Sequence, residues 1–69
     1  MNTIFVYKRQ AIGTGTMVHQ PNKGEYVKWL NQIFEVEDVM FDCMPNGNVN
    51  SVVYLKDTTV DTQNKLRYI

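Results

Sequence analysis

The chain has 69 residues, which is room for one small domain. Seven Lys and Arg balance seven Asp and Glu, giving a formal net charge of zero. This balance argues against a general nucleic-acid-binding protein, which needs a basic excess to displace counterions from phosphates. A single cysteine excludes an internal disulfide framework and is typical of a reducing compartment, so we expect a cytoplasmic protein. No apolar run approaches the roughly 18 residues of a membrane span, so we expect no membrane contact.

The first part of the chain predicts two strands. β-branched and aromatic residues recur throughout, whereas Ala occurs once, which favours strands over helices. Residues 3–9 contain a continuous apolar run and predict a strand that is covered on both faces or closes a barrel. Residues 12–20 predict a second strand, in which two glycines permit sharp coiling and one face carries Ile12, Thr14, Thr16 and Val18.

Residues 25–34 follow a turn predicted at Pro21 to Gly24 and allow two interpretations. As a helix, the segment places Tyr26, Leu30, Ile33 and Phe34 on one face, which gives an α+β alternative. As strands, residues 26–30 pair through a tight Asn31-Gln32 loop with a strand that starts at Ile33. The lack of a helix-capping residue and the crowding of aromatic and β-branched side chains favour the strands.

The strand that follows this loop changes phase. Phe34 and Val36 alternate in one phase, whereas Val39 and Phe41 alternate in the other, with the slip at Glu37-Asp38. One extra residue in a β-bulge would keep both apolar pairs on the inner face and bend the strand. Strongly bent strands are what a small closed barrel needs.

The last part of the chain predicts a hairpin. Asn46-Gly47 favours a turn with positive φ at both central residues. The strand after it alternates, with one face made of Val49, Ser51, Val53 and Leu55. Residues 65–69 predict one more strand or a contact with a neighbouring subunit. The sum is five or six short strands in an all-β barrel or compact sandwich.

Parts of these segments resemble small phage-encoded β-barrel proteins. The resemblance lies in Pro21 with Gly24-Glu25-Tyr26-Val27, then Asn31-Gln32, Phe34-Glu35-Val36 and Val39, then Val52-Val53-Tyr54-Leu55. It covers about half the chain and its motifs are structural. It implies a Src-homology-3-like or similar barrel and a viral or prophage origin, which would place the protein in a host cell's cytoplasm. It supplies no catalytic residue.

The polar residues indicate no catalytic or metal site. The only histidine, His19, is predicted to face outward, and Cys43 follows an anion, Asp42, where a reactive thiol needs a cation. A lone Gly13-Thr14-Gly15 has no following helix to cradle a phosphate. Four carboxylates lack the form of a Ca²⁺ loop and predict a solvated strand face or, alternatively, an acidic patch for a basic partner surface, namely Glu35, Glu37, Asp38 and Asp42. We therefore expect no metal, no cofactor and no enzymatic activity.

Aromatic and basic residues predict a binding surface. Aromatic residues make up 12% of the chain, more than a core this small can bury. Tyr and Trp anchor interfaces, and several lie next to basic residues. The candidate binding residues are Tyr7, Lys8, Arg9, Lys28, Trp29, Tyr54 and Lys56.

These observations favour a non-catalytic phage or prophage accessory protein that binds and modulates or inhibits a host protein, such as a defence component. The alternatives are a small structural or assembly protein of a virion, and an oligomeric barrel that binds nucleotides or nucleic acid. The tail alternates apolar and polar residues up to its end. It therefore predicts at least a homodimer, with a contact near Leu66, Tyr68 and Ile69.

Overall fold

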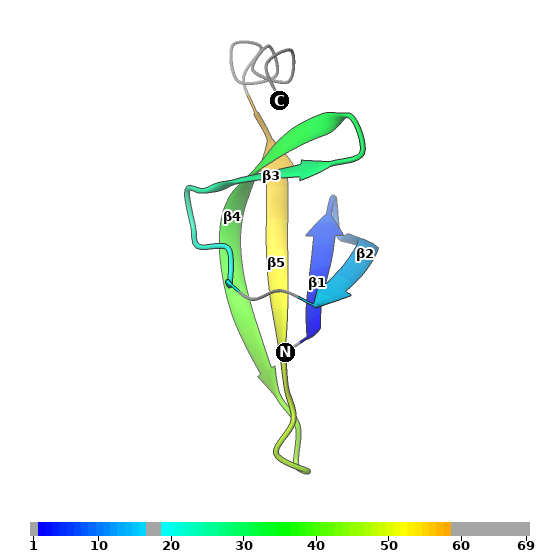
Figure 1. Ribbon diagram of the computed structural model, residues 1–69, viewed down its shortest axis with the longest axis vertical. Coiled ribbons are helices and arrows are strands. Elements are labelled where there is room, and N and C mark those ends of the chain that lie inside the picture. Colours follow the sequence, from blue (N-terminus) through cyan, green and yellow to red (C-terminus); the bar gives the residue numbers. More distant parts are fainter. Residues whose placement is uncertain (1, 17–18, 59–69) are drawn as a thin grey trace.

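A computed structural model describes residues 2–16 and 19–58. These residues form one sheet of five strands, β1 (Asn2–Tyr7), β2 (Gln10–Thr16), β3 (Tyr26–Trp29), β4 (Gln32–Cys43) and β5 (Val49–Asp57). The strand order is β2-β1-β5-β4-β3. β1 and β5 run parallel and the other neighbours are antiparallel, and the sheet curls into a half-barrel (Figure 1). The all-β prediction is confirmed.

The helix alternative for residues 25–34 is wrong, because this segment forms β3, a two-residue turn and the start of β4. β3 pairs with β4 from Tyr26 opposite Glu35 to Trp29 opposite Gln32. The turn is therefore Leu30-Asn31, one residue earlier than predicted, with Leu30 at a φ of 56°. No helix long and apolar enough to cross a membrane occurs in the part of the chain that the structure describes.

The predicted β-bulge is present in β4. Its pairing with β5 shifts register between Val36 and Asp38, so Glu37 is the extra residue. Val36 is fully buried and Val39 packs against the core, as the phase change predicted. Phe41 lies opposite the buried Ser51 but is 54% exposed. β3 pairs with β4 only as far as Glu35, so no third strand lies beside the part of β4 that carries Phe41.

The core lies on the inner face of the half-barrel. It consists of Phe5, Phe34, Val36, Val53 and Leu55. The predicted alternation of β5 is confirmed, since Ser51, Val53 and Leu55 are all buried. Next to the core, the buried hydroxyls of Thr3 and Ser51 lie 2.9 Å apart and hydrogen-bond each other across parallel strands. Both groups are thereby satisfied, which removes the cost of burying them.

Trp29 of β3 reaches across the inner face to β2, the opposite edge of the sheet. Its ring lies 5.5 Å from the Phe5 ring, centroid to centroid. A Cβ atom added to Gly13 would lie 2.1 Å from the Trp29 ring, so only glycine fits there. The prediction that Ile12 and Thr14 share one face is wrong. Ile12 packs against the core, whereas Thr14 pairs with Ile4 of the outer face.

Two further predicted features are corrected. The first strand ends at Tyr7, because Lys8-Arg9 turn the chain into β2. In the β4–β5 loop only Gly47 has a positive φ, of 89°. Five residues separate Cys43 from Val49, so the loop is longer than a two-residue turn. Within it the Gly47 N–H donates to the Met44 carbonyl over 3.0 Å, and the Met44 N–H donates to the Asn48 carbonyl over 2.8 Å. The turn predicted at Pro21 to Gly24 lies one residue later, from Asn22 to Glu25, with the Glu25 N–H donating to the Asn22 carbonyl over 3.0 Å. The strand and subunit contact predicted for residues 65–69 lie outside the described residues.

Replacing Gly13 with Ala should destabilise the fold, because the added methyl group overlaps the Trp29 ring. Overpacking of this kind typically costs about 1–3 kcal/mol in the free energy of unfolding. Gly15→Ala is the matched control, since a Cβ atom there meets no atom within 4 Å. Urea denaturation of both variants measures the difference. Equal midpoints for the two variants would contradict the contact between Gly13 and Trp29.

Candidate functional site

The turn between β1 and β2 has an unusual backbone. Lys8 and Arg9 have φ angles of 51° and 65°, and they join the paired residues Tyr7 and Gln10. Positive φ at both central positions defines the type I′ turn, which strongly prefers Asn and Gly. A side chain in the left-handed region costs about 1–2 kcal/mol per residue. The fold therefore holds two cationic side chains in a conformation that glycine or asparagine would adopt more easily.

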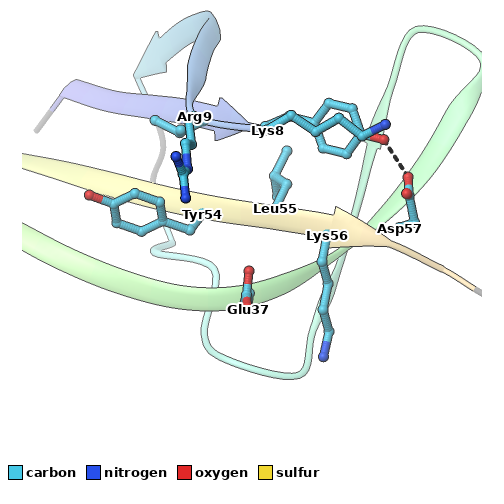
Figure 2. A pocket seen from close by; sticks show the side chains of 9 residues that line it. Lys8, Arg9, Glu37, Tyr54, Leu55, Lys56 and Asp57 are labelled. Carbon is cyan, nitrogen blue, oxygen red and sulfur yellow. Dashed lines mark hydrogen bonds between the residues drawn. The ribbon is translucent and has the colours of Figure 1, made fainter.

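A pocket of about 350 Å³ lies beside this turn (Figure 2). It sits at the rim of the half-barrel, where the turn meets β5 and the bulge of β4. We call it the turn pocket, and its lining consists of Val6, Tyr7, Lys8, Arg9, Glu37, Tyr54, Leu55, Lys56 and Asp57.

Tyr7 and Asp57 hold one end of the turn pocket in place. The Tyr7 hydroxyl donates a hydrogen bond of 2.5 Å to Asp57 Oδ1, shown as the dashed line in Figure 2. This hydrogen bond and the negative charge of Asp57 raise the pKa of Tyr7 above its ordinary value of 10.0. The Tyr7 ring packs 4.8 Å from the Phe34 ring, and the Lys8 ammonium lies 5.3 Å from the Tyr7 centroid. Tyr7 thus ties the core to the pocket as a neutral donor.

The remaining charges differ in their pairing. Lys56 Nζ lies 3.5 Å from Glu35 Oε2 in an exposed ion pair. The side chains of Arg9 and Glu37 make no hydrogen bond or ion pair with another residue of the described ranges 2–16 and 19–58. In Figure 2, Arg9 lies on the β1 side of β5 and Glu37 on the β4 side, with Tyr54 on β5. Of the charged side chains that line the turn pocket, Arg9 and Glu37 are therefore the two without a side-chain hydrogen bond, ion pair or ring contact to another described residue.

An apolar strip crosses the outer face of the sheet and joins the turn pocket. Ile4 and Val6 alternate with the buried residues of β1, and Val52 and Tyr54 alternate with those of β5. Ile4 pairs with Val52, which in turn pairs with Met40, and Met40 is 50% exposed. We call these residues the outer strip, namely Ile4, Val6, Met40, Val52 and Tyr54. Half-buried apolar residues in a contiguous group are typical of interaction surfaces.

The structure brings together most of the residues that the sequence singled out for binding. Five of them line the turn pocket, namely Tyr7, Lys8, Arg9, Tyr54 and Lys56. Trp29 does not, because its ring packs on Phe5 and Gly13 at the inner face. Lys28 is exposed on β3, away from this pocket.

Two charged lining residues, Glu37 and Asp57, were not among the candidate binding residues, although the sequence placed Glu37 in a possible acidic patch for a basic partner. The phase slip did locate Glu37 as a bulge residue, and bulges often re-aim a side chain next to a functional site. No local signal points to Asp57, because it meets Tyr7 only through the parallel pairing of β1 with β5.

The other candidates stay apart from the turn pocket. His19 lines a separate hollow made by residues 19–22 with Glu25 and Tyr26. Cys43 does not line this hollow. Cys43 is exposed at the end of β4. Among the described residues, no three His, Cys, Asp or Glu side chains gather closely enough to hold a metal ion.

Comparisons with known proteins do not assign the chain to a family. No protein-family description, no curated protein and no solved structure matches the chain. The resemblance to small phage-encoded barrels therefore stays a prediction, and the assignment of function depends on the geometry of the site.

The hydrogen bond from Tyr7 to Asp57 should make stability depend on alkaline pH. Because the folded pKa of Tyr7 is raised, its contribution is fully present below pH 10.0 and is lost as the pH rises through the folded value. Above pH 10.0 the unfolded chain loses this proton before the folded one does. The free energy of unfolding should therefore fall more steeply in the original protein than in Tyr7→Phe.

Urea titrations between neutral and strongly alkaline pH measure this difference. Tyr54→Phe is the control, because no hydrogen bond from its hydroxyl occurs within the described residues. It should keep the steep decline. Identical pH profiles for Tyr7→Phe and the original protein would show that this hydrogen bond does not contribute.

Proposed function

We propose that this chain is a non-catalytic binding protein that recognises a partner protein through the turn pocket and the adjoining outer strip. The observation that carries the proposal is the Lys8-Arg9 turn, in which two cationic residues adopt positive φ beside a pocket. Strained backbone of this kind tends to occur at functional sites, where the side chain matters more than local stability.

The outer strip adds the apolar area that a protein interface needs. Its five residues lie on three adjacent strands, and Val6 and Tyr54 belong to both the strip and the turn pocket. Aromatic and Arg side chains at the centre of such a surface are the usual anchors of binding energy. The charged rim would then fix the orientation of the partner.

The resemblance to small phage-encoded barrels extends this proposal to the partner's identity. In that setting the chain would be an accessory protein of a phage or prophage that binds a host protein and modulates or inhibits it. A binding surface with no need for a catalytic group suits such a role.

Replacing Lys8-Arg9 with Asn-Gly should separate stability from binding. The double variant K8N/R9G removes the strain of both residues, so the free energy of unfolding should rise by about 1 kcal/mol or more. Binding should be lost at the same time. The control is Leu30→Gly, which relieves positive φ at an 83% exposed residue of another turn and should become more stable while still binding.

Each variant is immobilised and exposed to a lysate of bacterial host cells, and captured proteins are identified by mass spectrometry. We expect proteins that bind the original chain and Leu30→Gly but are absent with K8N/R9G. Identical captured sets for all three, or a destabilised K8N/R9G, would contradict the proposal.

A second candidate function, self-association, is favoured by the edge strand β2. Its seven residues include no charged residue and no proline, the two devices that usually protect an exposed sheet edge. The other edge strand, β3, is only four residues long and carries Lys28. A net charge of zero also leaves no long-range repulsion between copies. Two copies of β2 could pair about a two-fold axis and extend the sheet.

Gly15→Lys should abolish this pairing without harming the monomer. Gly15 lies within β2, and an added Cβ atom there meets no atom within 4 Å. Sedimentation at high micromolar concentration should show a dimer for the original chain and a monomer for Gly15→Lys. The control Asn31→Lys adds the same charge at an exposed turn and should stay dimeric. A monomeric original chain would reject self-association.

A further inference from the structure

We propose that the turn pocket is selective for a dipolar segment of the partner, in which an acidic side chain faces Arg9 and a basic side chain faces Glu37. This inference depends on the proposed function and names the chemistry of the partner at that site.

Two irregularities of the backbone converge on the turn pocket and carry its unpaired charges. Arg9 belongs to the positive-φ turn between β1 and β2. Glu37 is the extra residue at the bulge of β4. These residues come from opposite sides of β5, yet both line the same pocket (Figure 2). Without the positive-φ turn and the bulge, the side chains of Arg9 and Glu37 would not both line this pocket.

The other charges in the pocket are already engaged. Asp57 accepts the hydrogen bond from Tyr7, and Lys56 pairs with Glu35. The Lys8 ammonium lies over the Tyr7 ring, an arrangement in which the ring attracts the cation. Arg9 and Glu37 are therefore the two charged side chains of the pocket that have no such contact within the described residues, and together they fit one anion and one cation.

The surface between these two charges is apolar and aromatic. Val6 and Tyr54 line the pocket alongside Arg9 and Glu37, whereas Leu55, also part of the lining, is buried in the core. An apolar surface lowers the local dielectric and strengthens ion pairs formed across it.

The same charge pattern disfavours nucleic acid at this pocket. A phosphate backbone is uniformly anionic, and it would approach Glu37 as well as Arg9. Binding to such a backbone depends on an excess of cations, which this chain lacks. A partner with both signs of charge satisfies both residues.

Short peptides test the inference on the full chain. The probes are Ac-Glu-Ala-Lys-NH₂ and Ac-Lys-Ala-Glu-NH₂, compared with Ac-Glu-Ala-Glu-NH₂ and Ac-Lys-Ala-Lys-NH₂. Millimolar titrations followed by ¹H–¹⁵N NMR report on the amides of Val6, Arg9, Tyr54 and Leu55. At least one mixed peptide should bind about threefold or more tightly than either like-charged peptide, the effect of one exposed ion pair.

Two variants assign the preference to the two residues. With Arg9→Gln, the mixed peptide should lose its advantage over the all-lysine peptide. With Glu37→Gln, it should lose its advantage over the all-glutamate peptide. Lys28→Gln, which removes an exposed charge outside the turn pocket, should change neither preference.

Equal binding of all four peptides would overturn the dipolar inference. So would a thymidine oligonucleotide that shifts the same amides at lower concentration than any peptide. If peptides show no preference but captured partners still depend on Lys8 and Arg9, the proposed function stands and this inference alone fails. If the preference is present but no partner depends on the turn, the proposed function fails instead.

Discussion

The contact between Trp29 and Gly13 is the constraint on which the half-barrel depends. β2 and β3 are opposite edges of the sheet, and no strand pairing joins them in the part of the chain that the structure describes. Trp29 spans the inner face and fills the space above Gly13 and Phe5. A flat sheet would leave this ring and the core beneath it exposed. The curl of the sheet and the glycine in β2 therefore depend on each other.

The curl also gives the two faces of the sheet different roles: the inner face forms the core and the outer face stays accessible. The inner face holds the core and a satisfied hydroxyl pair, Thr3 with Ser51. The bulge at Glu37 keeps Val36 and Val39 on that inner side while β4 bends. The outer face keeps apolar residues that the core does not need. A chain this small buries a limited area, so apolar residues left outside it favour an interaction surface over a second core.

The turn pocket combines features that oppose local stability with features that stabilise it. Lys8 and Arg9 are strained, whereas Tyr7 anchors the same turn through Phe34 and Asp57. The anchor comes from core packing and a hydrogen bond, so the turn keeps its geometry despite the poor choice of turn residues. Such a balance suits a site that is formed before the partner arrives, since preorganisation lowers the entropy lost on binding.

The sequence by itself determined the all-β class, the alternation of β5 and the bulge at Glu37, because side-chain periodicity depends only on local backbone geometry. It also identified five residues of the turn pocket, through aromatic and basic neighbours along the chain. Only the tertiary structure decided that Trp29 belongs to the inner face and that Lys8 and Arg9 form a strained turn. Only the tertiary structure brought Glu37 and Asp57 to that turn. The meeting of Glu37 and Asp57 with the turn depends on the parallel pairing of β1 with β5, strands that lie more than forty residues apart, and no local pattern encodes such a pairing.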